Sequence, residues 1–187
     1  RKCENLALRY QRANLLTRTE QDEVVQMFDD LVLRYGADKH PAIAALRRST
    51  SRGVLYHHAG MLPVFKDIVE RLFTSGLVKL LFTTETFALG VNMPAKCVIF
   101  DSLSKWNGFE IVHITPLDFR QMAGRAGRQG IDTEGEVYSI LDPRYDTPNK
   151  INDILHKRPG AVTSKFALGY STILSLVKIL GPTIESA

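Results

Sequence analysis

Stretches with helical spacing of apolar residues alternate along the chain with short, continuous apolar runs. The first pattern predicts amphipathic helices and the second predicts buried strands. Helices are predicted over residues 3–16, 19–36, 41–48 and 63–76, and from about residue 116. Strands are predicted over residues 54–58, 78–82, 97–100 and 135–141. This order predicts an α/β fold with a mostly parallel sheet.

Local signals refine these boundaries. Thr19 is expected to cap the second helix, because its hydroxyl can accept a hydrogen bond from the amide of Asp22. Pro41 and Pro63 suit the first turns of the helices that they open. Asn-Gly between apolar residues predicts a β-hairpin within residues 103–114.

The character of the sequence changes after residue 143. A polar stretch is followed by a short helical pattern over residues 151–156 and a longer amphipathic one over residues 164–180. The longer helix has little left to pack on within one domain. We therefore expect one domain over residues 1–143, and a linker with the start of a neighbouring domain over residues 144–187. No strand precedes the first helix, so we expect the chain to be a fragment that lacks the first strand of its domain.

Composition limits the class of protein and leaves the function open. The chain has 187 residues, of which 44% are hydrophobic and 24% charged, as in ordinary globular domains. It has no apolar stretch long enough to cross a bilayer and no signal peptide at its start. Cys3 and Cys97 fit no metal-ligand spacing and suit a reducing compartment. A net charge of +4 permits nucleic-acid binding without predicting it.

The most informative segment is QMAGRAGRQG, residues 121–130. On a helix, Gln121, Arg125 and Arg128 project to one side, and the small residues between them let another body approach closely. Two guanidinium groups beside an amide suit phosphate oxygens. The alternative is a solvated basic helix end that interacts with the helix dipole. Glycine before each arginine and glutamine a turn earlier favour the phosphate clamp.

A second segment, FTTETFALGVNMPA, spans residues 82–95. A predicted strand ends in hydroxyl groups that include Thr84 and Thr86, and Gly90 and Asn92 follow. The carboxyl ends of parallel strands are where α/β sheets hold ligands. Hydroxyl groups and amides there can hold a nucleic-acid phosphate without selecting a sequence. An ordinary polar loop between a strand and a helix would look the same.

In order along the chain, YHHAGMLP, LFTTETFALGVNMPAKCVIF and QMAGRAGRQG resemble motifs IV, V and VI of the DExH-box superfamily 2 helicases, and more narrowly of the superkiller-like (Ski-like) RNA helicases. The resemblance is dense over residues 53–143. It implies a RecA-like three-layer sandwich with a largely parallel sheet and a C-terminal helical extension. It further implies the second, C-terminal motor lobe of an ATP-dependent RNA helicase, an ATP hydrolase.

The same resemblance assigns roles around the nucleotide. Arg125 and Arg128 match the arginines that reach the γ-phosphate of ATP bound on the first lobe. Gln121 matches the glutamine that couples this contact to the nucleic-acid groove, and Gly90 and Asn92 match positions that face the nucleotide.

For RNA, the resemblance implies backbone contacts from one turn and two hydroxyl groups: His58, Ala59, Gly60, Thr84 and Thr86. Glu85 is expected to couple the RNA and ATP sites. No metal site is expected on this lobe, and His57 with His58 is a poor metal pair because neighbouring side chains on a strand point to opposite faces.

The predicted hairpin falls where the family has its strand-separating hairpin, which would comprise Trp106, Asn107, Gly108 and Phe109. An ordinary surface hairpin is an equal alternative. Trp106 and Phe109 could stack on a base at the duplex junction or pin the hairpin to the lobe. The sequence departs from many relatives at Gln129, where they have a third arginine.

The cofactors implied are ATP and Mg²⁺, both bound mainly by the first lobe. The chain has no G-x-x-x-x-G-K-[ST] loop and no Asp-Glu-x-His run, so we expect no ATP hydrolysis by this chain alone. The partners implied are single-stranded RNA, the first lobe and RNA-decay machinery, with no membrane. The expected location is the cytoplasm, with the nucleus as the alternative. A winged-helix-type domain is expected after the lobe. A non-catalytic scaffold lobe and a DNA helicase lobe remain open.

Overall fold

The computed structural model describes residues 2–85, 93–158 and 169–180. The chain divides into two compact units, Arg1–Lys157 and Arg158–Ala187, each of which is described by itself. The second unit contains one described helix, α8 (Tyr170–Leu180). It covers the later part of the helix predicted over residues 164–180.

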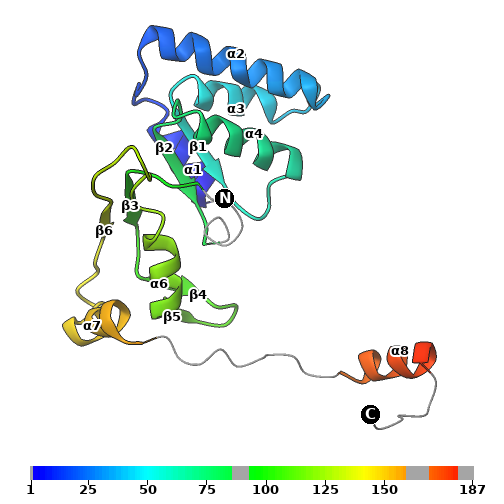
Figure 1. Ribbon diagram of the computed structural model, residues 1–187, viewed down its shortest axis with the longest axis vertical. Helices are drawn as coiled ribbons and strands as arrows, with labels where there is room; N and C mark the ends of the chain where they lie inside the picture. The colour runs from blue at the N-terminus through cyan, green and yellow to red at the C-terminus, as the bar shows by residue number, and fades with distance from the viewer. Residues whose placement is uncertain (1, 86–92, 159–168, 181–187) are drawn as a thin grey trace. The chain divides into compact units, whose positions relative to one another are not determined.

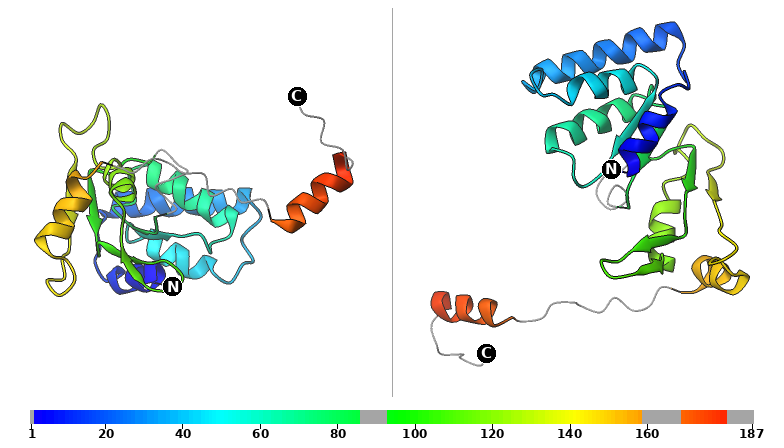
Figure 2. Two further views of the ribbon diagram at one scale, coloured as in Figure 1. Left: turned by 90° about the horizontal axis from the view of Figure 1, so that it is seen from below. Right: turned by 180° about the vertical axis from the view of Figure 1, so that it is seen from behind.

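The first part of the larger unit is built on a parallel pair of strands, β1 (Val54–His57) and β2 (Leu80–Thr83). Four helices belong to it: α1 (Lys2–Tyr10), α2 (Arg18–Arg34), α3 (Ile43–Thr50) and α4 (Pro63–Thr74). Seen from behind, α1 lies across β1 and β2 (Figure 2). Side chains of β1 alternate between two faces, so His57 meets Glu70 on α4 and His58 meets Glu4 on α1.

The main hydrophobic core lies among α2, α3, α4 and β1 (Figure 1). Its largest fully buried side chains are Phe28, Leu46, Leu55, Ile68 and Leu72. On α2 the buried residues are Val24, Phe28, Leu31 and Val32, the spacing of one helix face. The helical periodicity of the sequence is therefore explained by burial.

The second part of the larger unit contains a parallel pair, β3 (Cys97–Phe100) with β6 (Glu136–Ser139), and an antiparallel hairpin, β4 (Ser104–Trp106) with β5 (Ile111–His113). Helices α6 (Pro116–Ala123) and α7 (Pro148–His156) lie beside them. A smaller core comprises Phe100, Leu103, Ile114 and Ile154. Ile154 of α7 thus belongs to the first unit, although the sequence placed a boundary at residue 143.

The strands of the described part of the chain form three separate pairs. Both longer pairs are parallel and the hairpin is antiparallel, so the α/β character is clear. A single sheet that joins β1, β2, β3 and β6 stays a prediction. None of the helices in the described ranges has the length and apolar character needed to span a bilayer.

The predicted boundaries of three helices were wrong. Helix α3 begins at Ile43 with Ala42 as its N-cap, so Pro41 precedes the helix and does not lie in its first turn. Helix α1 ends at Tyr10 rather than residue 16, because the chain turns back: the amide of Leu15 donates to the carbonyl of Arg52 (3.3 Å), and Leu16 enters the main core. Helix α2 begins at Arg18 with Thr17, not Thr19, as its cap.

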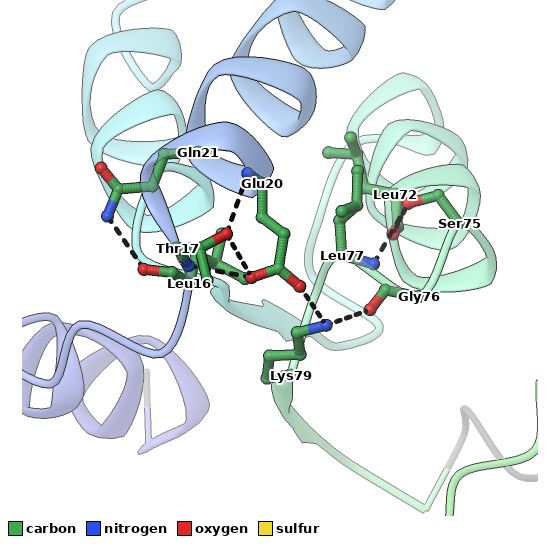
Figure 3. A network of polar contacts seen from close by, with 9 residues as sticks. All are labelled: Leu16, Thr17, Glu20, Gln21, Leu72, Ser75, Gly76, Leu77 and Lys79. Carbon is green, nitrogen blue, oxygen red and sulfur yellow. Dashed lines mark hydrogen bonds and ion pairs between the residues drawn. The ribbon is translucent and has the colours of Figure 1, made fainter.

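Thr17 forms a capping box with Glu20. Its hydroxyl accepts a hydrogen bond from the amide of Glu20 (3.3 Å), and the Glu20 carboxylate accepts one from the amide of Thr17 (2.8 Å). The ammonium group of Lys79 lies 2.9 Å from the second oxygen of Glu20 (Figure 3). This contact fastens the start of α2 to the segment that enters β2.

Replacing Thr17 with Ala should lower the free energy of unfolding by about 1 kcal/mol, because the first turn of α2 loses its cap. Thr19→Ala, which removes a hydroxyl two residues later, should change it by less than about 0.5 kcal/mol. Urea unfolding of the chain measures both variants. Equal effects of the two would contradict the assignment of Thr17 as the cap.

Candidate active site and nucleic-acid interface

Helix α6 leads into the QMAGRAGRQG segment but does not contain all of it. The helix begins with a capping box in which Thr115 and Asp118 exchange hydrogen bonds, and it ends at Ala123. The prediction that Gln121, Arg125 and Arg128 share one helix face was wrong, because only Gln121 is helical. Gly127 has φ +90°, a left-handed conformation that breaks a right-handed helix.

The loop that follows α6 is fixed by backbone contacts within the chain. The amide of Ala95 donates to the carbonyl of Arg125 (2.9 Å), and the amide of Gly127 donates to the carbonyl of Ala95 (2.7 Å). On the other side, a Cβ on Gly135 would lie 2.4 Å from the carbonyl carbon of Ala126. The small residues therefore let other segments of the same chain approach closely. The sequence had suggested that they make room for a separate molecule or domain.

The guanidinium group of Arg128 is held by Asp132. Its Nε and Nη2 atoms donate to the two carboxylate oxygens, each at 2.8 Å, and the Arg128 amide donates to the same carboxylate at 3.0 Å. These hydrogen bonds lower the pKa of Asp132 to about 2. The Arg-x-x-x-Asp spacing was the signal for this pair, and the sequence analysis missed it.

Gln121 and Arg125 differ in their surroundings. The Gln121 side chain is exposed on α6. Arg125 is partly buried, and its carbonyl is bonded to Ala95. The structure thus places both arginines on one short loop beside Ala95, in the second predicted motif.

The candidate RNA-binding residues lie where β1 and β2 end. These strands are parallel, so the turn after β1 and the segment after β2 share one edge of the pair. Thr84 is exposed, and its amide donates to the carbonyl of His57 (3.3 Å). Thr86, Gly90 and Asn92 lie outside the described residues, and their roles stay predictions.

The turn after β1 is closed by His58. Its Nδ1 atom accepts a hydrogen bond from the amide of Gly60 (3.1 Å), and its Nε2 atom lies 3.1 Å from Glu4 on α1. Ala59 and Gly60 are exposed. His57 and His58 point to opposite faces, as predicted, and the described part of the chain has no cluster of three or more potential metal ligands.

Glu85 and the start of α6 are joined by Lys105 of β4. The Lys105 ammonium group lies 2.8 Å from a carboxylate oxygen of Glu85 and 2.9 Å from one of Asp118. The sequence analysis singled out Glu85 but found no role for Lys105 or Asp118. No local spacing signals this contact, because Glu85 and Lys105 are 20 residues apart in the sequence.

The predicted hairpin is confirmed. Trp106 pairs with Ile111, and residues 107–110 form the turn, in which Asn107 Oδ1 accepts hydrogen bonds from the amides of Phe109 and Glu110 (both 2.9 Å). Trp106 is 64% exposed and Phe109 is 90% exposed. Most of the surface of both side chains is therefore open to solvent.

Comparison with known proteins gives the same assignment as these motifs. Residues 31–130, more than half of the chain, match the helicase conserved C-terminal domain. The chain is 40% identical over 179 residues to the DExH-box ATP-dependent RNA helicase DExH10 of Arabidopsis thaliana, covering 95% of the chain and 18% of that protein. It is 38% identical over 186 residues to the human Superkiller complex protein 2, covering 98% and 15%. It is 45% identical over 136 residues to the probable helicase HelY of Mycobacterium tuberculosis, covering 73% and 15%.

The chain belongs to the superkiller-like superfamily 2 helicases, as their C-terminal lobe. Membership implies the RecA-like α/β fold. The chain spans less than a fifth of the length of each of these relatives. In this helicase lobe, the roles assigned to individual residues around ATP and RNA stay predictions.

The ion pair of this helicase lobe predicts a specific titration. The pKa of Asp132 should be about 2 in the folded chain, below its ordinary value of 3.8. Because folding lowers this pKa, the contribution of the pair to stability is complete above about pH 4 and is lost as the pH falls toward 2. Carboxyl-carbon NMR should show the pKa of Asp132 rising toward 3.8 in Arg128→Ala.

The matched control for this titration is Arg144→Ala. Asp142 also has a pKa lowered to about 2, by hydrogen bonds from Arg144. That substitution should therefore move Asp142 and leave Asp132 unchanged. An Asp132 pKa that stays near 2 in Arg128→Ala would contradict the assigned cause.

Proposed function

We propose that this lobe is the C-terminal motor lobe of an ATP-dependent RNA helicase. It closes on the first RecA-like lobe of the same protein when ATP and single-stranded RNA bind, and it brings Arg125 and Arg128 to the γ-phosphate. One observation carries the proposal: the backbone of Ala95, within the second motif, is hydrogen-bonded to the arginine loop at 2.9 and 2.7 Å. A displacement on the nucleic-acid side therefore moves the arginines.

The RNA groove of the proposal lies at the edge where β1 and β2 end. It would comprise His58, Ala59, Gly60, Thr84 and Thr86. Ala59, Gly60 and Thr84 are exposed, and amides and hydroxyl groups suit contacts to phosphate and sugar. RNA as the substrate is supported by the name of the similar DExH-box ATP-dependent RNA helicase.

ATP and Mg²⁺ would be held mainly by the first lobe, with Gly90 and Asn92 facing the nucleotide. This chain alone should not hydrolyse ATP, because its sequence has no phosphate-cradling loop and no Asp-Glu-x-His run. The strands would form one largely parallel sheet between helix layers. Residues 144–187 would lead from the lobe, over residues 1–143, into a winged-helix-type domain.

The hairpin is proposed to separate strands. Exposed Trp106 and Phe109 offer aromatic faces to an unpaired base, and Asn107 holds the turn at residues 107–110. RNA-decay machinery is the proposed partner, since the name of the human relative places that protein in a superkiller complex. The cytoplasm is the proposed location, with the nucleus as the alternative.

One observation favours a second candidate, a non-catalytic scaffold lobe. The Nε and Nη2 atoms of Arg128 are bonded to Asp132, as those of an arginine with a structural role would be. In the motor, Arg128 must leave Asp132 to reach a phosphate. The two functions therefore differ in what the loss of Arg128 does to ATP turnover.

The proposed function is tested on the parent protein with both lobes. Its ATP turnover should rise several-fold on addition of single-stranded RNA, because RNA binding favours the closed state. Turnover is measured with RNA, with DNA of the same sequence and without nucleic acid. No turnover under any condition would favour the scaffold, and equal or greater stimulation by DNA would overturn RNA as the substrate.

Arg128→Ala in the same parent protein should lower the ATP turnover rate by roughly 10³-fold or more, as loss of an arginine finger does. Arg144→Ala is the control, because that arginine also pairs with a nearby aspartate yet lies outside the loop. The steady-state ATP turnover of both variants is measured at saturating ATP and RNA. Undiminished turnover in Arg128→Ala would contradict the finger assignment.

A further inference from the structure

Lys105 lies where three segments of the proposed motor meet. It belongs to β4 of the hairpin and pairs across the hairpin with Val112. Its ammonium group contacts both Glu85, which follows β2, and Asp118, in the first turn of α6. One cation thus bridges the RNA-side segment and the helix that leads into the arginine loop.

The contact with Asp118 acts on the cap of α6. The same Asp118 oxygen that contacts Lys105 at 2.9 Å also accepts a hydrogen bond from the amide of Thr115 (3.2 Å). The amide of Asp118 in turn donates to the Thr115 hydroxyl (3.1 Å). A shift of Lys105 therefore acts directly on the first turn of the helix that carries Gln121.

The contact with Glu85 acts on the RNA-side edge. Glu85 follows Thr84, whose amide is bonded to the carbonyl of His57 at the end of β1. Lys105 and Glu85 are 2.8 Å apart, and this hydrogen bond is the main cause of a raised pKa of Lys105. Without the cation, the carboxylates of Glu85 and Asp118 would share one small region and repel each other.

We propose that Lys105 is a positioning residue that couples the RNA-side edge and the hairpin to the arginine loop. RNA that displaces the hairpin or Glu85 moves the ammonium group, and the ammonium group moves the start of α6. This role rests on the proposed motor function and extends it. It assigns regulation of ATP turnover by RNA to a side chain outside the residues predicted to bind RNA or ATP.

The lobe contains a matched control. Lys79 makes an ion pair with Glu20 at 2.9 Å and is 39% exposed, against 31% for Lys105. It joins the start of β2 to the cap of α2 and touches none of the predicted motifs (Figure 3). Loss of Lys79 should therefore remove a comparable ion pair without affecting coupling.

The test uses the parent protein with both lobes and the variants Lys105→Met, Lys105→Arg and Lys79→Met. The measured quantity is the ratio of RNA-stimulated to basal ATP turnover, together with the RNA concentration that gives half-maximal stimulation. Lys105→Met should lower the ratio by about fivefold or more, because about fivefold is the lower end of the range of typical coupling between two sites. Lys105→Arg should restore much of it, and Lys79→Met should leave it unchanged.

Three results would overturn the coupling role while leaving the proposed function intact. They are an unchanged ratio in Lys105→Met, an equal loss in Lys79→Met and Lys105→Met, and a loss in Lys105→Met that Lys105→Arg does not restore at all. A wild-type parent with no RNA-stimulated turnover would overturn the proposed function, and the coupling role with it. Wild-type stimulation that survives in Lys105→Met would overturn the coupling role alone.

Discussion

The arrangement of the candidate site depends on one close backbone contact. The arginine loop lies between Ala95, to which it is hydrogen-bonded, and Gly135, whose Cα has no room for a side chain beside Ala126. The main chains of three segments, around Ala95, Ala126 and Gly135, are in direct contact there. The pairing of β3 with β6 continues from the same contact, since Glu136 follows Gly135 directly. The path of the loop is therefore fixed by main-chain atoms.

Two kinds of electrostatic contact operate around this loop. Arg128 and Asp132 are four residues apart, and their pair stabilises one local conformation. Lys105 instead joins segments that come from three different elements. A local pair can form whatever the rest of the lobe does, whereas the bridge requires the hairpin, the edge and α6 to be in place together. The Lys105 bridge therefore forms only when all parts of the site are correctly arranged.

The sequence predicted the elements of the larger unit well, because their patterns follow from burial on one face or in the core. The Asn107-Gly108 signal predicted the hairpin, and the strand over residues 97–100 was confirmed at both ends. The prediction of a helix through Arg128 was wrong because α6 already ends at Ala123 and Gly127 has a left-handed conformation, neither of which the periodicity of side chains reveals. Thr17 and Thr19 are both plausible caps by type, and only the box with Glu20 distinguishes them. Lys105 could not be predicted, since its partners are near it only in three dimensions.

The carboxylate of Asp132 competes with anything else that binds the guanidinium group of Arg128. Two hydrogen bonds of 2.8 Å hold that group in its own loop. The apparent affinity of this loop for an incoming anion is its intrinsic affinity multiplied by the fraction of molecules in which Arg128 is released. Under the proposed motor function, an acidic residue four positions further along the chain therefore sets the fraction of lobes in which Arg128 is available to a phosphate.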